Sequence, residues 1–348
     1  MKLNISYLFL AVFFTMACNN YEQVPDLVLE SEEFIFEEGL FFDQCHASTI
    51  EETSSGDLLV SWFGGSGEGA EDVAIWGSLH DGERWSQPRV LADGRVGDSL
   101  KFPCWNPVLF RPEDEGRIFL YYKVGPNPRE WWGMTKVSDD GGKTWGSERR
   151  LPDGILGPIK NKPIELTDGT VLAPSSVELT ESRWTAHIER SDKQQMNWTV
   201  HPIDHGSEFN VIQPSILVHP DNRLQVLCRS REGKVMSSWS ENRGLTWSSL
   251  TPTNLINPNS ATDAIRVNDY FLIVYNPDTP GKDWWEGRSQ LNVAYSIDGL
   301  EWTDILELEN KTMGEFSYPT IFLDSQNKIH ITYTFDRKNI KHVVLRER

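Results

Sequence analysis

The sequence predicts an all-β fold, a six-bladed β-propeller. Three observations lead to this prediction: a turn motif that ends in tryptophan recurs along the chain, six segments that begin with a polar residue recur at a similar interval, and no window has the apolar spacing of a capped amphipathic helix. Units of about fifty residues with roughly four strands each are typical of propeller blades. The 348 residues accommodate six such units, which we place in a single domain over residues 34–348.

The turn motif has the pattern Ser-x-Asp-x-Gly-x-Thr-Trp and is complete at residues 138–145. Residues 240–247 have asparagine at the aspartate position, residues 296–302 are one residue shorter, and residues 78–85 and 191–198 keep only the serine and the tryptophan. In a β-hairpin turn, Asp or Asn accepts hydrogen bonds from backbone N–H groups, Gly supplies a positive φ, and Trp packs beneath the next strand. The motif therefore predicts hairpins at a nearly fixed position in each unit.

The second repeat is a polar residue, often followed by proline, that precedes two apolar strands. The six polar residues, spaced 60, 56, 51, 50 and 55 residues apart, are His46, Asn106, Lys162, Gln213, Asp263 and Tyr318. Because inner strands line the central channel of a propeller, we expect these side chains to form a ring at its mouth. The last unit ends near Val344, so a strand over residues 34–42 is expected to complete the circle.

Composition excludes several classes of function. Lys and Arg total 33 and Asp and Glu total 51, which gives a formal net charge of −18. Because a surface that binds phosphate groups needs an excess of cationic side chains, we expect neither nucleic acid nor an anionic membrane surface as a partner. Apolar residues at 39% and charged residues at 24% are ordinary for a folded domain and unlike a disordered chain.

The first residues have the pattern of a targeting segment. Lys2 precedes a short apolar run over residues 8–14, and small residues then lead to Cys18, which resembles a bacterial lipobox. We predict a signal peptide over residues 1–17, a lipidated Cys18 and a linker over residues 18–33, with an ordinary secretory signal as the alternative. The protein is then expected in the periplasm or at the cell surface, attached to the membrane only through this lipid.

Three further cysteines, Cys45, Cys104 and Cys228, are predicted to be buried free thiols. Their number is odd and no pair has Cys-x-x-Cys spacing, so neither a disulfide framework nor a zinc site is expected. A Cys45–Cys104 bridge is the alternative, because both residues precede equivalent strands of the repeat. We predict no cofactor and no bound metal.

The turn motifs resemble the Asp-boxes, or BNR repeats, of sialidases and their relatives, over roughly residues 40–348. The resemblance implies a propeller in which three arginines hold a sugar carboxylate, and a tyrosine paired with a glutamate is the nucleophile. It places Arg229 or Arg231 in the role of the second arginine, Arg288 in the role of the third and Tyr318 in that of the nucleophile. It also implies Asp72 as the acid/base, with Glu68 and Glu71 as alternatives.

Two departures from the sialidase pattern bear on the reaction. The sequence has His46-Ala47-Ser48 where an Arg-Ile-Pro is expected, and Val211-Ile212 where a glutamate precedes Gln213. A histidine, a tyrosine and a clamp for a carboxylate suit β-elimination at a uronic acid, because neutralising the carboxylate makes the C5 proton removable. We expect His46 and Tyr318 to share the base and acid roles, in either order.

The predicted function is β-elimination at the non-reducing-end acidic sugar of an oligosaccharide, as in the propeller lyases and ulvan-oligosaccharide dehydratases that the sequence resembles in outline. The alternatives are sialidase-like hydrolysis of a terminal acidic sugar and glycan binding without catalysis. Aromatic pairs in two loops, Trp131-Trp132 and Trp284-Trp285, are expected to stack on sugar rings or to pack within their loops. The remaining channel residues Lys162, Asn106, Gln213 and Asp263 are expected to contact the substrate, whereas Lys160 is expected to be a solvated surface lysine.

Overall fold

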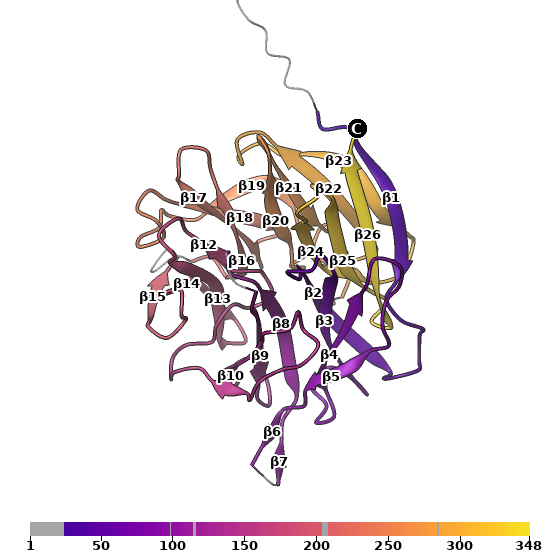
Figure 1. Cartoon of the computed structure of the whole chain (residues 1–348). Coiled ribbons are helices and arrows are strands. Elements are labelled where there is room, and N and C mark those ends of the chain that lie inside the picture. Colours follow the sequence, from indigo (N-terminus) through magenta and orange to yellow (C-terminus); the bar gives the residue numbers. More distant parts are fainter. Residues whose placement is uncertain (1–23, 98, 114–115, 204–207, 284) are drawn as a thin grey trace, which may run out of the picture.

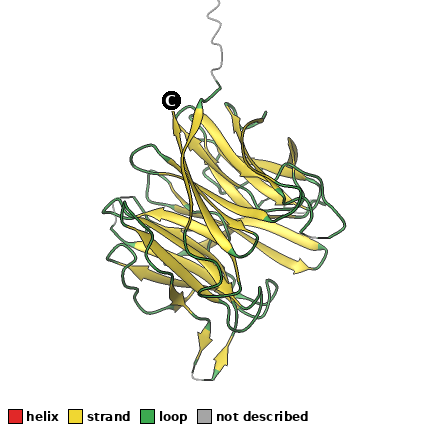
Figure 2. Ribbon diagram, turned by 90° about the vertical axis from the view of Figure 1, so that its right-hand side faces the viewer, coloured by secondary structure: helices red, strands yellow, loops and turns green. Residues whose placement is uncertain are grey.

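The computed structural model describes residues 24–97, 99–113, 116–203, 208–283 and 285–348. All regular elements in these residues are β-strands, which form six four-stranded antiparallel sheets and one short hairpin (Figure 1). Figure 2 shows the strands in yellow, joined by loops and turns in green. The predicted all-β, six-bladed propeller is therefore confirmed. Within the described residues, no helix has the length and apolar character needed to cross a bilayer.

The strands of blades 1 to 5 follow the sequence in each sheet. Blades 1 and 2 contain β2 (Gln44–Glu52), β3 (Leu58–Gly65), β4 (Ala74–His80), β5 (Arg89–Ala92), β8 (Cys104–Phe110), β9 (Ile118–Val124), β10 (Trp132–Ser138) and β11 (Arg149–Arg150), with the hairpin β6 (Arg95–Val96) and β7 (Leu100–Lys101) between them. Blades 3 and 4 contain β12 (Ile164–Glu165), β13 (Val171–Thr180), β14 (Arg183–Ser191), β15 (Trp198–Pro202), β16 (Val211–Val218), β17 (Leu224–Ser230), β18 (Lys234–Ser240) and β19 (Thr251–Ile256). Blade 5 contains β20 (Asp263–Val267), β21 (Tyr270–Tyr275), β22 (Gln290–Ser296) and β23 (Thr303–Asn310).

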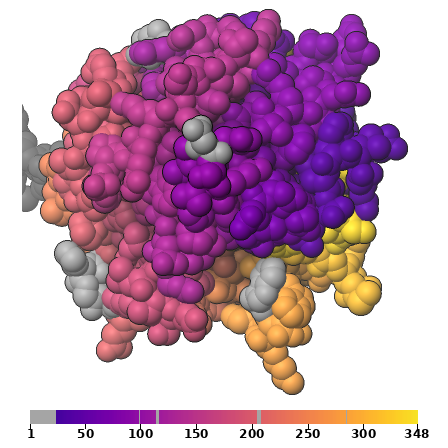
Figure 3. Space-filling model, turned by 90° about the horizontal axis from the view of Figure 1, so that it is seen from below, coloured from indigo at the N-terminus to yellow at the C-terminus, as the bar shows by residue number. Residues whose placement is uncertain are grey.

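Blade 6 joins the two ends of the chain. It contains β24 (Phe316–Leu323), β25 (Ile329–Phe335), β26 (Asn339–Glu347) and the N-terminal strand β1 (Leu27–Phe34), which pairs with β26. In Figure 3 the colours of the chain follow one another around the molecule, so that yellow C-terminal residues lie next to indigo N-terminal ones. An N-terminal strand thus completes the ring, as the sequence predicts.

The predicted position of this strand, residues 34–42, is wrong apart from Phe34. The residues after Phe34 form turns instead, because their aromatic side chains pack into blade 1 and do not alternate between two faces. Phe36 stacks on Trp62 with ring centroids 5.0 Å apart, and Phe42 lies 5.2 Å from Trp76. The phenylalanines of this segment therefore indicate aromatic packing against blade 1 and not a strand.

The complete turn motif forms the expected hairpin turn. Asp140 accepts hydrogen bonds from the Thr144 backbone N–H at 2.7 Å and from the Thr144 hydroxyl, while Ser138 Oγ accepts one from Gly142 N–H at 2.8 Å. Gly142 has a φ of +84°, which a side chain would strain. The tryptophan at the end of the motif, Trp145, packs against the core between blades 1 and 2.

In five of the six blades the inner strand enters the channel through a residue in the left-handed region of φ. These residues are Ala47, Asn106, Lys160, Gln213 and Tyr318, with φ between +38° and +70°. In blades 1, 2, 4 and 6 the residue lies in a bulge at the same place in the register of the innermost strand pair. The sequence therefore predicted the wrong ring residue in two blades. In blade 1 it predicted His46, one residue before Ala47, and in blade 3 it predicted Lys162, two residues after Lys160.

Cys45, Cys104 and Cys228 are buried free thiols, which confirms the main prediction for the cysteines. The alternative bridge between Cys45 and Cys104 is absent, since both sulfurs are unpaired in the described structure. Burial is also the main cause of the raised pKa of each thiol. These thiols therefore contribute to packing and are poor nucleophiles.

Candidate active site

Tyr318 and Arg229 form the centre of the candidate site. Arg229 on β17 donates a hydrogen bond from Nη1 to the phenolic oxygen of Tyr318 at 2.7 Å. The same guanidinium donates to Oε1 of Gln213 at 3.3 Å and, through Nε, to Oδ1 of Asn259 at 2.8 Å. All three partners are neutral side chains, so among the described hydrogen bonds and ion pairs Arg229 has no carboxylate. Its positive charge is available to an anion.

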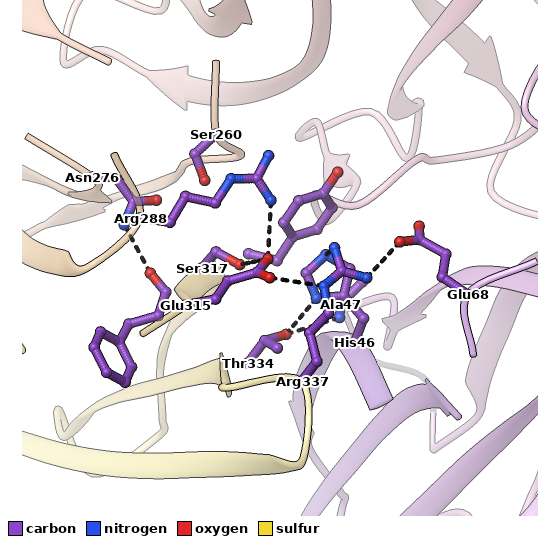
Figure 4. A network of polar contacts seen from close by, with 12 residues as sticks. His46, Ala47, Glu68, Ser260, Asn276, Arg288, Glu315, Ser317, Thr334 and Arg337 are labelled. Atoms are coloured by element: carbon purple, nitrogen blue, oxygen red, sulfur yellow. Dashed lines mark hydrogen bonds and ion pairs between the residues drawn. The ribbon is translucent and has the colours of Figure 1, made fainter. Parts of the chain in front are cut away.

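Two further arginines lie beside this pair and are linked by one carboxylate. Arg288 Nη1 contacts Glu315 Oε1 at 3.0 Å, and Arg337 Nε contacts Glu315 Oε2 at 2.8 Å (Figure 4). Ser317 Oγ donates to Glu315 Oε1 at 2.9 Å, and Arg337 Nη1 pairs with Glu68 at the far side. Burial alone would raise the pKa of Glu315, but the charge and hydrogen bonds of Arg337, together with the charge of Arg288, outweigh it and lower that pKa. Glu315 therefore holds both guanidinium groups as a carboxylate.

His46 lies between Tyr318 and Arg337. Its ring centroid is 4.0 Å from that of Tyr318, its Nδ1 is 2.9 Å from Thr334 Oγ1, and its Nε2 is 3.5 Å from Arg337 Nη2. Because a guanidinium can only donate, Nε2 is the acceptor and Nδ1 carries the proton. Only 2% of His46 is exposed.

His46 is therefore a neutral imidazole. Burial first, and then the positive charges of Arg337, Arg288 and Arg229, hold its pKa well below the usual value for histidine. Protonating this ring would add a fourth positive charge to a buried cluster that already contains three arginines. The arrangement favours an anionic ligand and disfavours an imidazolium.

Of the two alternatives for the second arginine, Arg229 faces Tyr318 and Arg231 does not. Arg231 is exposed, donates to the backbone oxygen of Glu181 and lies with its guanidinium carbon 5.0 Å from the Trp184 ring. The Trp184 ring also lies 5.7 Å from the guanidinium carbon of Arg229 and supports that side chain. The resemblance gave no means of choosing between these two arginines.

Asp72 is occupied within its own loop. Its two oxygens accept hydrogen bonds from Ser66, at 2.9 Å from the backbone N–H and at 2.8 Å from the hydroxyl. The carboxylate of this loop that contacts the arginine cluster is that of Glu68, which pairs with Arg337. The structure thus brings Glu68 to the site, while it places Asp72 where it shapes the loop.

The other predicted channel residues divide between the mouth and the interior. Asn106 and Gln213 are buried at the mouth, and Gln213 contacts Arg229. Asp263 is fully inside the channel, where it accepts hydrogen bonds from Ser215 Oγ at 3.1 Å and from the Ile321 N–H at 3.1 Å. Asp263 therefore holds the inner strands together.

Lys162 does not lie at the mouth of the channel. Its ammonium pairs with Glu51 at 2.8 Å and donates to the backbone oxygen of Leu109 at 3.0 Å. It lines a separate, largely apolar cavity with Ile216 and Ile321. The expectation that Lys162 belongs to the ring is wrong because proline follows Lys162 but the left-handed residue of blade 3 is Lys160.

Lys160 is buried, which corrects the expectation of a solvated surface lysine. Its Nζ donates to Asn161 Oδ1 at 2.9 Å and to the backbone oxygens of Thr262 and Pro319. Burial lowers the pKa of Lys160 to about 8, although the negative charge of Asp263 acts against this shift. A cation thus lies directly behind the backbone of Tyr318 and its neighbour Pro319.

The two predicted tryptophan pairs differ in their burial and in how far the structure describes them. Trp131 and Trp132 are half-buried and line a cavity between blades 2 and 3. Trp285 is 50% exposed, and Trp284 lies outside the described residues, as does Cys18. Stacking on sugar thus stays a prediction for both pairs.

Sequence reasoning missed Arg337, Glu315 and Thr334. Arg337 lies in the turn between β25 and β26, and only closure of the ring brings it next to His46 on β2. Arg337 thus adds a third guanidinium to the cluster, on the side of His46. Within the described residues, no group of three or more His, Cys, Asp or Glu side chains is arranged to hold a metal ion.

Comparison with known proteins places the chain in a family. The profile of the family described as BNR repeat-like domain matches residues 56–331, which is most of the chain. A search of curated proteins found no match.

Solved structures share the fold over nearly the whole chain. The Hadza microbial sialidase Hz136 has a TM-score of 0.75 at 20% identity, covering 91% of this chain and 68% of that one. A protein of unknown function from Dyadobacter fermentans has a TM-score of 0.74 at 15% identity, covering 93% and 100%. The Trypanosoma rangeli sialidase has a TM-score of 0.71 at 14% identity, covering 92% and 60%. At these identities the likeness establishes the fold.

Proposed function

The chain belongs to the BNR repeat-like domain family, and on that premise we propose that it is a carbohydrate-active enzyme that catalyses β-elimination at a terminal uronic acid of an oligosaccharide. The observation that carries the proposal is the hydrogen bond of 2.7 Å from Arg229 to the phenolic oxygen of Tyr318, beside a cluster of further arginines. This pair offers a phenolic oxygen held by a guanidinium, next to cations that suit a carboxylate.

The carboxylate of the uronic acid would lie among Arg229, Arg288 and Arg337. Arginine presents a planar fork that matches the two oxygens of a carboxylate. Arg229 and Arg288 both lie against Tyr318, and Arg337 shares Glu315 with Arg288. Charge neutralisation lowers the cost of forming a carbanion at C5, next to the carboxylate. Substrate binding and activation thus rest on the same cations.

Tyr318 is the group best placed to move the proton. Acting as general base in its deprotonated form, with Arg229 hydrogen-bonded to its oxygen, it would take the C5 proton, and the C5 electron pair would form the C4–C5 double bond while the C4–O bond breaks. The proton then passes from Tyr318 to the departing oxygen, which leaves as water from a terminal uronate. His46 is a poor proton acceptor because the surrounding arginines disfavour an imidazolium. Its role would be to orient Arg337 and the Tyr318 ring.

The test is the ultraviolet absorbance of the conjugated double bond on incubation with uronate-terminated oligosaccharides. We expect the wild type to generate this absorbance and Tyr318→Phe to lower the rate by about 10²–10⁴-fold, the range for removal of a general base. A saturated product from the wild type, or a Tyr318→Phe variant as fast as the wild type, would refute the proposal.

Sialidase-like hydrolysis of a terminal acidic sugar is the second candidate. It is favoured by the third guanidinium, that of Arg337, which restores a cluster of three arginines around Tyr318, and by the acidic Glu68 beside it. In that reaction Tyr318 would attack the anomeric carbon, and oxygen from solvent would enter the product. Against it, the described side chains that contact the Tyr318 hydroxyl and Arg229 include Gln213 and no carboxylate base. Incorporation of ¹⁸O from labelled water separates the two reactions, and glycan binding without either product would indicate a non-catalytic propeller.

A further inference from the structure

A cavity of about 350 Å³ opens beside the candidate site, between blades 2 and 3. Its walls come from the loop between β9 and β10, the segment between β11 and β12, and the end of β13. The residues that matter for its chemistry are Arg129, Trp131, Trp132, Arg150, Val177 and Glu178.

Packed aromatic rings link the wall of the cavity to the arginine cluster. Trp131 packs against Trp105 with centroids 6.0 Å apart, Trp105 lies 6.2 Å from Phe63, and Phe63 lies 5.7 Å from His46. One aromatic chain therefore connects the wall of the cavity with the imidazole at the centre of the site.

Glu178 gives a second connection between the cavity and the site. Burial raises the pKa of its carboxyl group, and the positive charges of Arg229, Arg129 and Arg231 act against that shift. Glu178 thus lies within electrostatic reach of Arg229 in the site and of Arg129 at the rim of the cavity.

The lining suits a pyranose ring. Indole rings and aliphatic side chains provide an apolar surface for the C–H face of a sugar, and charged groups at the rim provide partners for its hydroxyls. Trp131 Nε1 is buried without a described hydrogen-bond partner, so the contribution of this side chain to the wall is the apolar surface of its ring. Arg150 lies with its guanidinium carbon 5.2 Å from the Trp132 ring and is 3.5 Å from Asp153, which leaves Arg129 as the exposed donor at the rim.

We propose that this cavity binds the second sugar of the substrate, the pyranose covalently linked to the acidic sugar held by the arginines. This inference rests on the proposed function for the identity of the first sugar. Trp131 and Trp132 hold the apolar face of the second sugar, and Arg129 donates to its oxygens. The enzyme therefore prefers an oligosaccharide to a single uronic acid.

The experiment compares two ligands that share the terminal uronate: a uronate-terminated disaccharide and the methyl glycoside of the same uronic acid. Dissociation constants are measured by calorimetry in the Tyr318→Phe background, so that turnover does not interfere. We expect Arg129→Ala to weaken disaccharide binding about tenfold, the scale of one hydrogen bond. Trp131→Phe should also weaken it, because the smaller ring offers less apolar surface, and both variants should leave the methyl glycoside unchanged. Trp131→Phe keeps an aromatic ring in the wall and Arg129 is exposed, so both variants are expected to fold.

The matched control is Arg346→Ala, which removes an exposed arginine on β26 far from the cavity and should change neither constant. Equal weakening of both ligands, or no change for either, would overturn the proposed subsite. Because binding is measured without turnover, a wild type that binds both ligands but forms no unsaturated product would refute the proposed reaction and still test the subsite.

Discussion

The guanidinium of Arg337 contacts the imidazole of His46 through Nη2 and Nε2, 3.5 Å apart, although 291 residues separate them in the sequence. Arg337 also shares Glu315 with Arg288, so the last blade completes a cationic cluster that begins on blades 4 and 5. The first inner strand contributes a neutral acceptor to this cluster where the sialidase pattern has an arginine.

Replacing Arg337 tests this cluster. We expect Arg337→Ala to lower kcat/KM on a uronate-terminated substrate by about 10²–10³-fold, the scale of removing one donor that stabilises developing charge. Arg231→Ala is the matched control, because Arg231 stacks on Trp184 away from Tyr318 and should change the rate little. Comparable losses in both variants would mean that Arg337 contributes only general positive charge.

His46 is predicted to position its neighbours and not to transfer the proton. His46→Ala should therefore reduce kcat by less than Tyr318→Phe does, and Thr334→Val, which removes only the partner of Nδ1 at 2.9 Å, should reduce it less still. Because the pKa of His46 is held well below its usual value, kcat should show no step near pH 6.5 that His46→Ala abolishes. A larger loss from His46→Ala than from Tyr318→Phe would assign the base to histidine.

The architecture could be predicted because its signals are local. A Ser-x-Asp-x-Gly-x-Thr-Trp turn supplies hydrogen-bond acceptors for its own backbone donors, as Asp140 does for Thr144. Eight consecutive residues are therefore enough to specify the hairpin. Proline after Asn106, Gln213 and Tyr318 marks the left-handed residue correctly in three blades. Ala47 has no proline after it, and in blade 3 a proline follows Lys162 and not Lys160, which explains the errors of register.

The site could be predicted only in part because two of its cations depend on contacts between blades. Arg337 is in a short turn of ordinary composition and reaches His46 only after β1 and β26 close the ring. Lys160 is buried against backbone oxygens of Thr262 and Pro319. Every residue has a backbone oxygen, so no residue type in the sequence indicates this contact. Tyr318, Arg229 and Arg288, by contrast, were reached through the resemblance to sialidases.

The neutral side chain of Gln213 is predicted to distinguish elimination from hydrolysis. Gln213→Glu would place a carboxylate within reach of Arg229, which now contacts Gln213 Oε1 at 3.3 Å. A carboxylate there competes with the phenolic oxygen of Tyr318 and with the substrate for Arg229, so the rate of elimination should fall about tenfold or more. A gain of hydrolysis, measured as solvent ¹⁸O in a saturated product, would instead favour the sialidase-like reaction.

The proposed lipid anchor has its own test. If Cys18 is lipidated, Cys18→Ala should move the protein from the membrane fraction to the soluble fraction without changing its specific activity. The measurement is fractionation combined with mass spectrometry of the N-terminal peptide. A wild-type protein recovered without lipid would leave an ordinary secretory signal as the explanation of residues 1–17.

Lys160 is predicted to make both stability and activity depend on alkaline pH. Its pKa of about 8 lies below the value of about 10.4 for an exposed lysine, so between these values the unfolded chain binds more protons than the folded one. The contribution of this group to the free energy of unfolding therefore rises as the pH increases through that window. Activity should change in the opposite direction, because a neutral Lys160 no longer places a positive charge behind the Tyr318–Pro319 backbone.

We therefore expect the kcat of the wild type to decrease above about pH 8. The Lys160→Met variant should have a lower kcat that no longer shows this decrease.

The matched control is Lys123→Met, because Lys123 is also buried with a lowered pKa, of about 7, but donates to Pro158 O, away from Tyr318. Lys123→Met should keep the alkaline decrease in kcat. Urea unfolding at pH 7 and pH 9.5 measures the stability of each variant separately, so that a loss of folded protein is not mistaken for a loss of kcat. A wild-type kcat that is constant across this range would remove Lys160 from the electrostatics of the site.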